Sequence, residues 1–330
     1  MDFASILTTA LNGAIGPVAA AYALAAIGLN VHFGYTGLLN FGQVGFMLVG
    51  AYGVAISVSV FGLPLWVGML VGVLSAVVLA LLLGLPTLRL RSDYLAIATI
   101  AAGEILRLFY RSSFAEPVTG GVFGLQRFAN DFYDLNPIPP GRYELGPIIL
   151  SSRDLWVTLF GWGLVLLATL LVYLLIHSPW GRVIRSIRED EFAALSLGKN
   201  VYAYKLQSLV LGGVIGSFGG MVLVFNTQSA SPDSFDPVVT FFLYTLLVLG
   251  GAGRVFGPLL GSVLFWFIVV SLDSTLRQAI GAGYIPSDVL SASEAGAVRF
   301  ALVGLGLLLL MVYRPQGILG RKEEMVLDAR

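Results

Sequence analysis

Two groups of polar side chains interrupt apolar stretches of this sequence, and both could act on a solute or a proton. The first is Glu104 with Arg107, three residues apart in the apolar stretch 94–111. In a helix this spacing places both side chains on one face, where they can form an ion pair. Charged groups in such a segment are costly and usually face a protein interior or a wet cavity. The pair therefore fits a gate or lining of a polar path, or an ion pair that fixes helix packing; we favour the structural ion pair.

The second group lies in a break between His32 and Gln43, where glycines and amide side chains interrupt an apolar run. Unwound backbone inside a membrane is tolerated only where protein buries it or where it lines a cavity. Asn40 and Gln43 therefore either line a cavity and contact a solute, or bond neighbouring carbonyls in a close-packed turn. We favour the turn, and we expect His32 to be a packed or interfacial residue rather than a proton relay.

The residue composition argues against an enzyme, a metal site and a nucleic-acid-binding protein. The chain has no Cys, two His, and nineteen Lys and Arg against nineteen Asp and Glu. This composition excludes iron–sulfur and thiolate zinc sites, and it lacks the excess of cations that nucleic-acid binding needs. Phe256 stands where a dinucleotide fingerprint needs its third glycine, and Gly198-Lys199 is followed by Asn200 instead of the Ser or Thr of a phosphate loop. We expect no catalytic residues, no bound metal and no cofactor on this chain.

The elements that position the polar groups are expected to be membrane helices. The 330 residues are 57% hydrophobic and 12% charged, whereas a soluble domain carries about 25% charged residues. A helix needs about 20 apolar residues to cross a bilayer. We therefore predict an all-α, polytopic transmembrane bundle of about nine or ten spans, forming one domain over 1–330, with spans at 12–31, 41–61, 63–85, 94–111, 155–176, 205–225, 238–250, 257–272 and 298–313. The short pair 238–250 and 257–272 fits two half-spans or two tilted helices.

The charges in the loops predict an orientation. Lys and Arg are more frequent on the side that carries 177–204 and the C-terminus, which by the positive-inside rule is the cytoplasmic side. The N-terminus is then extracytoplasmic, and the tail 315–330 is cytoplasmic. The loop 112–154, rich in Pro, Gly and aromatic residues, lies outside. It is either a lid or partner platform, or a stretch of irregular packing.

The cytoplasmic stretch 177–204 is expected to contain a short surface helix over 182–198. Its apolar residues have helical spacing opposite a charged face: Val183, Ile187, Ala194 and Leu197 against Arg182, Arg185, Glu189 and Asp190. Such a helix can seat in a groove of a soluble partner. The alternative is a solvated connecting loop.

The sequence from Glu191 to Gly198, with paired alanines and a glycine four residues later, resembles the coupling loop of ATP-binding-cassette (ABC) importer permeases. The common form has Glu directly before the alanines; here Phe192 stands there, Glu191 is one residue earlier, and the downstream Leu-Pro is absent. With these departures, 188–205 resembles permeases for branched-chain amino acids of the LivM type. Five further motifs, spread along the chain before and after this stretch, resemble that family: Gly37–Gln43 with Gly45–Met47, Thr119–Gly121 with Gly124–Leu125, Ser231–Phe235, Leu249–Gly253 with Gly257–Pro258, and Arg314–Gly320.

The resemblance implies a permease subunit of an ABC importer in the cytoplasmic (inner) membrane, which moves branched-chain amino acids by alternating access. It implies several partners besides the lipid bilayer: two ATPases that use the ATP, a second, similar permease, and an extracytoplasmic solute-binding protein. The residues expected to couple to the ATPases are Arg188, Glu189, Asp190, Glu191, Ala193, Ala194 and Gly198, and those expected in the translocation path are Asn40, Gln43, Glu104 and Arg107. The alternatives are a urea or short-amide permease of the same family and, in a different class, a stand-alone channel or ion-coupled carrier.

Overall fold

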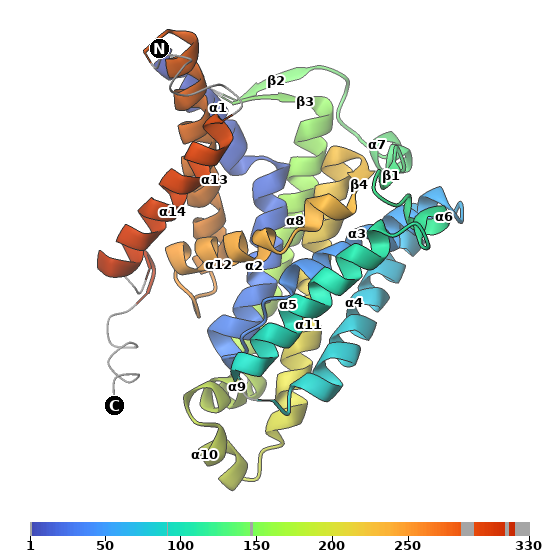
Figure 1. Cartoon of the computed structure of the whole chain (residues 1–330), viewed down its shortest axis with the longest axis vertical. Coiled ribbons are helices and arrows are strands. Elements are labelled where there is room, and N and C mark those ends of the chain that lie inside the picture. The colour runs from blue at the N-terminus through green and yellow to red at the C-terminus, as the bar shows by residue number, and fades with distance from the viewer. Residues whose placement is uncertain (1, 91, 146–147, 285–293, 314–316, 321–330) are drawn as a thin grey trace.

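The computed structural model is a bundle of helices (Figure 1) and describes residues 2–90, 92–145, 148–284, 294–313 and 317–320. Its main helices are α1 (Phe3–Ile15), α2 (Pro17–Leu29), α3 (Gln43–Ser59), α4 (Leu65–Thr87), α5 (Ser92–Arg111), α8 (Ser152–His177), α11 (Val201–Thr227), α12 (Val238–Gly250), α13 (Gly257–Gly281) and α14 (Ala295–Tyr313). A π-helix, η1 (Asn30–Tyr35), continues α2. The all-α fold expected from the sequence is confirmed. The predicted tail 315–330 lies outside the described residues, apart from 317–320.

Short elements lie toward the two ends of the bundle. One end carries α9 (Pro179–Glu189) and α10 (Glu191–Ser196), whereas the N-terminus and the strands of 112–154 lie toward the other end (Figure 1). Within 112–154 and after α11 stand the short elements α6 (Glu116–Thr119), β1 (Leu125–Gln126), α7 (Asn130–Asp134), β2 (Arg142–Leu145), β3 (Ile148–Ser151), β4 (Ser229–Ala230) and η2 (Pro232–Phe235). β2 pairs with β3, and β1 with β4, both antiparallel. The second pairing ties the long loop to the chain that follows α11.

Five helices in the described part of the chain are long and apolar enough to cross a membrane: Pro17–Tyr35, Leu65–Thr87, Ser152–His177, Val201–Thr227 and Gly257–Gly281. Shorter apolar helices are Phe3–Ile15, Gln43–Ser59, Val238–Gly250 and Ala295–Gly306. Each of the nine stretches predicted as spans contains a helix, including the charged α5. At 1.5 Å per residue the 13 residues of α12 extend about 20 Å, too short for the bilayer core, whereas the 25 residues of α13 are sufficient.

The predicted first span, 12–31, is not one helix in the structure. It is divided at Gly16, which is extended, and Pro17 takes the first position of α2. Proline suits this position because no N–H is needed there and its φ is already helical. The separate α1 lies along α13, and the Asp2 N–H donates to the Gln278 side chain at 2.9 Å.

Helices α2, α3 and α11 form the centre of the bundle, and small residues let them approach closely. Almost every residue of α2 is buried. Gly28 of α2 lies against Gly212 of α11, and Gly220 of α11 lies against the backbone of Met47 in α3. Glycine and alanine permit such backbone contacts, which hold helices together where no water drives association. The outer helices α4, α5 and α8 instead expose leucines and isoleucines, as surfaces facing lipid or another subunit do.

Candidate functional site

The break predicted between His32 and Gln43 is present. After η1 the chain passes through Gly37, which has φ of +75°, and turns before α3 begins at Gln43. The Leu38 N–H donates to the His32 carbonyl at 2.9 Å, and the Thr36 hydroxyl to the Val31 carbonyl at 2.8 Å. A π-helix leaves its turn wider than an α-helix and occurs frequently at functional sites. Side chains and unusual backbone bonds thus take the place of regular helix bonding here.

Asn40 and Gln43 are buried, and their amide groups are fully used within the chain. Asn40 Nδ2 lies 3.1 Å from Gln43 Oε1 and 3.0 Å from His32 Nδ1. Gln43 Nε2 donates to the carbonyls of Ala25 in α2 (3.2 Å) and Gly212 in α11 (3.3 Å). An amide nitrogen has two protons, so neither side chain retains a free donor for a solute. This bonding fits the close-packed turn, while a role of these residues in the path stays a prediction.

Helices α5 and α12 flank the break. The Phe41 N–H donates to Thr99 of α5 at 3.0 Å. The Tyr244 hydroxyl of α12 donates to the Asn40 carbonyl at 3.1 Å, and its ring stacks on Phe41 with centroids 4.7 Å apart. Phe241 of α12 lies 5.6 Å from the same Phe41 ring. The unwound segment therefore meets an aromatic surface shared with α12.

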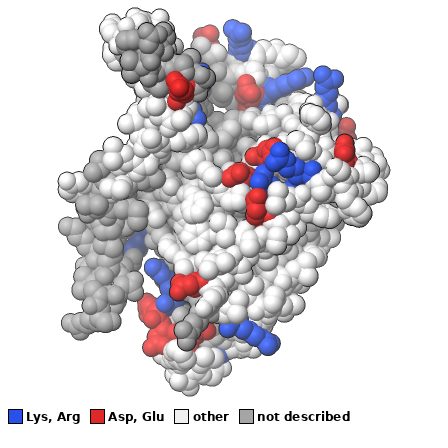
Figure 2. All heavy atoms as spheres, in the orientation of Figure 1, with Lys and Arg blue, Asp and Glu red and all other residues white. Residues whose placement is uncertain are grey.

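Glu104 and Arg107 of α5 form the ion pair that their spacing predicts, with two bonds of 2.8 and 2.6 Å. Arg107 also bonds Asp233 of η2 at 3.0 Å, and Arg111 lies 3.4 Å from the same carboxylate. The Arg107 side chain is 12% exposed, Glu104 33% and Asp233 47%. Figure 2 shows a compact patch of both charges within a broad uncharged surface on the face where α5 lies in front. We call Glu104, Arg107, Arg111 and Asp233 the ion cluster.

Sequence reasoning missed Asp233 as the partner of Arg107. The signal was present in the motif Ser231–Phe235, which contains the only acid of that stretch, but no local spacing links it to α5. Each carboxylate in the cluster pairs with at least one arginine, so neither Glu104 nor Asp233 is an unpaired charge. Charge-assisted bonds of this kind are shorter and stronger than neutral ones.

A double-mutant cycle is expected to show that Glu104 and Arg107 stabilise each other. We expect Arg107→Gln to lower the thermal stability of the purified protein, because Glu104 then loses its bidentate partner. Adding Glu104→Gln removes the uncompensated carboxylate, so the double variant should recover a coupling energy of about 1 kcal/mol. Strictly additive losses would contradict the structural ion pair.

The coupling stretch does not form the single helix predicted over 182–198. It forms α9 and α10, divided at Asp190, whose backbone is extended. The Asp190 carboxylate accepts the Ala193 N–H at 3.0 Å and so caps α10. Aspartate favours this position because its side chain satisfies an N–H that has no partner in the first helical turn. The predicted coupling residues all lie in or next to these two short helices, at one end of the bundle.

Some of the predicted coupling residues contact other parts of the chain, and the others are exposed. Ala194 is buried, Glu191 pairs with Lys205 at 2.6 Å, and the Arg188 guanidinium bonds the Gly34 carbonyl. Glu189, Asp190 and Ala193 are exposed, and Gly198 has φ of +74° with no atom near its missing Cβ. Three apolar side chains also point away from the protein: Phe192, Leu195 and Leu197. We call these three residues the apolar tip.

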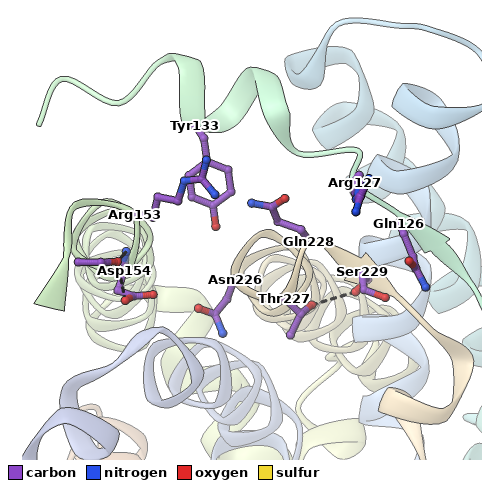
Figure 3. A pocket seen from close by; sticks show the side chains of 10 residues that line it. Gln126, Arg127, Tyr133, Arg153, Asp154, Asn226, Thr227, Gln228 and Ser229 are labelled. Atoms are coloured by element: carbon purple, nitrogen blue, oxygen red, sulfur yellow. Dashed lines mark hydrogen bonds between the residues drawn. The ribbon is translucent and has the colours of Figure 1, made fainter. Parts of the chain in front are cut away.

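A polar pocket of about 550 Å³ lies where 112–154 meets the ends of α8 and α11 (Figure 3). Its lining includes two arginines, Arg127 and Arg153, and the polar run Asn226–Ser229. Arg153 lies over the Tyr133 ring at 5.4 Å, and the Tyr133 hydroxyl donates to the Phe225 carbonyl at 2.7 Å. This pocket was not predicted from the sequence, because its residues come from three segments that only the fold brings together.

Comparison with known proteins identifies the family of this helical bundle. Residues 14–312 match the family described as the permease component of branched-chain amino acid transport systems. The chain belongs to the branched-chain amino acid permease family. As such a permease it is a multi-pass membrane subunit of an ABC transporter and not an enzyme.

Three transport proteins are similar to most of this chain. The permease is 30% identical to the high-affinity branched-chain amino acid permease protein LivM of Escherichia coli K12, covering 90% of this chain and 67% of that one. It is 27% identical to a probable branched-chain amino acid permease LivM of Methanocaldococcus jannaschii, covering 91% of each chain. It is also 27% identical to the nucleoside ABC transporter permease NupC of Lactococcus lactis, covering 83% of this chain and 84% of that one.

Proposed function

We propose that this permease is one of the two membrane subunits of an ABC importer that carries branched-chain amino acids into the cell. Its partners would be two cytoplasmic ATPases, a second permease of similar sequence and an external solute-binding protein. The end with α9 and α10 would lie in the cytoplasm, and the N-terminus and 112–154 would lie outside, consistent with their places at opposite ends (Figure 1). Loop charges support the same orientation.

The apolar tip is the observation that carries this proposal. Phe192 is 81% exposed, and Leu195 and Leu197 are exposed beside it at the end of the bundle. Large apolar side chains outside the bilayer have no lipid to cover them, and a short helix that presents them fits a hydrophobic groove. An ATPase that receives this tip would supply the energy that a chain without a phosphate loop cannot supply itself.

The face that carries the ion cluster is proposed to line the translocation path. Charged side chains exposed to lipid are expensive, even when paired, because hydrocarbon cannot solvate them. The partly exposed cluster on α5 and η2 is therefore expected to face the second permease or a water-filled cavity between the two. Phe41, Phe241 and Tyr244 would supply apolar surface on the same side of the break.

The mechanism proposed is alternating access. ATP binding closes the two ATPases and moves α9 and α10, and the bundle rocks against the second permease. The cavity between the permeases then opens to the other side, while the break and the ion cluster move with their helices. Substrate would reach the outer opening from a binding protein docked on 112–154.

Branched-chain amino acids are proposed as substrates from the family and from the two LivM relatives. A path with paired charges and aromatic surface suits small zwitterions with apolar side chains. The nucleoside permease among the relatives makes nucleosides the alternative to test, together with urea and short amides. Competition of each compound against radiolabelled leucine uptake in cells expressing the transporter separates these substrates.

Replacing Phe192 with aspartate is expected to release the ATPases from this permease. The substitution puts a charge in place of the largest side chain of the apolar tip, so the groove of the partner would have to bury it unpaired. We expect the ATPases to be recovered in affinity purification with the unaltered permease and lost with the variant, by tenfold or more for a loss of about 1.4 kcal/mol.

Phe123→Asp is the matched control, because Phe123 is also 81% exposed but lies in 112–154 at the other end. This variant should retain the ATPases. If Phe192→Asp retained them as well, the apolar tip would not be the docking site. If the unaltered permease came out alone and folded, the stand-alone channel or carrier would replace the importer.

A further inference from the structure

Arg188 connects the coupling end to the break in the helix. Its guanidinium Nη1 donates to the Gly34 carbonyl in η1, at 2.5 Å. Its stem runs over Gly37, where a Cβ would lie 3.3 Å from the Arg188 Cγ. Gly37 has φ of +75°, so a larger residue would be strained there as well as crowded. This bond joins α9 to η1, beside a second contact in which the Arg185 guanidinium lies 5.9 Å from the centre of the Tyr35 ring.

Asn30, one turn earlier in η1, makes two hydrogen bonds to the loop between α12 and α13. Its Nδ2 donates to the Arg254 carbonyl at 2.9 Å, and its Oδ1 accepts the Gly253 N–H at 2.8 Å. A Cβ on Gly253 would lie 3.2 Å from Arg188 Nη1 and 3.1 Å from the Gly34 carbonyl oxygen. Three segments meet at this point: the end of α9, the turn of η1 and the loop 251–256.

These bonds hold a π-helical turn, η1, whose hydrogen bonding differs from that of the α-helix before it. A π-helix bonds i to i+5 instead of i to i+4, and such turns occur frequently at functional sites. The bond from Arg188 is charge-assisted and therefore holds one carbonyl of η1 more strongly than a neutral donor would. Energetic coupling between distant sites can be carried by chains of hydrogen bonds and packed side chains, and this junction has hydrogen bonds on both sides of η1.

We propose that Arg188 is the positioning residue that passes movement of α9 and α10 to η1, and that Asn30 passes it from η1 to the loop that begins α13. The inference rests on the proposed ABC importer and adds the route by which ATPase motion reaches the path. Helix α12, at the other end of that loop, holds the break through Tyr244 and through Thr240, which accepts the Val44 N–H at 3.1 Å. The unwound segment is therefore in contact with the proposed route at both ends, through η1 before it and through α12 after it.

The test compares transport per ATP hydrolysed for the full complex, with both permeases, the ATPases and the binding protein, in proteoliposomes with radiolabelled leucine. Arg188→Met keeps the length of the stem and removes the donors. It is expected to lower leucine uptake per ATP about tenfold, within the range of energetic coupling between sites, while the complex still assembles and hydrolyses ATP. Arg188→Lys keeps a charged donor and should restore part of the ratio. Arg182→Met, an exposed position on the same helix, is the control and should leave the ratio unchanged.

Asn30→Ala and its combination with Arg188→Met test the second step. If both residues act on one route, the double variant should be no worse than the poorer single variant, because the route is already cut. A double loss equal to the product of the two single losses would overturn the relay through Asn30.

Two further results would overturn the role of Arg188. One is normal uptake per ATP in Arg188→Met; the other is a parallel fall in assembly, ATP hydrolysis and thermal stability that lysine does not restore. The second result would show a purely structural bond. A wild-type complex without ATP-driven uptake of leucine, isoleucine or valine would instead refute the proposed function, and the inference would fall with it.

Discussion

Replacing Gly198 with proline is expected to abolish uptake while leaving the chain inserted in the membrane. Gly198 has φ of +74°, and its N–H donates to the Leu195 carbonyl at 2.9 Å, which closes the end of α10. Proline fixes φ near −65° and has no N–H, so it can neither adopt this conformation nor make this bond. The chain after α10 must then leave in another direction, and the apolar tip is displaced. The measurement is leucine uptake in cells, with the amount of permease in membranes determined by immunoblot.

Gly198→Ala is the control for Gly198→Pro. It adds a side chain at this position without forcing the chain to leave α10 in another direction. Among the residues that the structure describes, no atom lies within 4 Å of a Cβ at this position, so alanine causes no clash with them. It retains the N–H and has only the cost of a left-handed conformation, about 1 kcal/mol. We expect most of the uptake to remain. Normal uptake by the proline variant would contradict the coupling role, and its absence from membranes would indicate a folding defect.

Replacing Asn40 with leucine is expected to unfold the centre of the protein. Leucine has a similar size but removes the bonds to His32 and Gln43 and the acceptor of the Gly42 N–H, which lies 2.9 Å from Asn40 Oδ1. Each buried polar group left without a partner costs about 1–3 kcal/mol, so the sum is a large part of a typical folding free energy. We expect little folded protein and a clearly lower melting temperature in detergent.

Ser262→Ala is the matched control for Asn40→Leu. Ser262 is also buried, and within the described part of the chain its hydroxyl makes one hydrogen bond, to the Ala19 carbonyl at 2.7 Å. Its loss should therefore be close to about 1 kcal/mol. A direct contact of Asn40 with the substrate would give a different result, a raised KM for uptake with unchanged thermal stability. That outcome would favour the cavity interpretation of the break over the close-packed turn.

Local features of the sequence were sufficient to predict most of the helices and one contact. A run of about 20 apolar residues has few stable alternatives to a helix in a membrane, since its backbone must bond internally. The spacing of Glu104 and Arg107 predicted their ion pair, because residues three apart share a helix face. The glycines and amides between His32 and Gln43 predicted the break. Each of these predictions depends only on neighbours along the chain.

Helix ends and divisions were predicted less well, because they depend on single residues whose effect is conditional. Pro17 begins α2 instead of interrupting a longer span, and Asp190 divides the coupling stretch into α9 and α10. Proline and aspartate are both compatible with the first turn of a helix and with a loop. Which of the two they adopt is decided by the packing of the segments on either side.

The sequence by itself predicted a helical membrane protein with a break between His32 and Gln43, an ion pair of Glu104 with Arg107 and a stretch that resembles the coupling loop of ABC permeases. Only the tertiary structure decided which distant groups meet: Arg107 with Asp233, Arg188 with Gly34, and Asn30 with Arg254. The physical reason is that hydrophobic length and helical spacing act over one or two turns. Bonds between residues more than a hundred positions apart depend on how closely glycines and alanines let the helices approach.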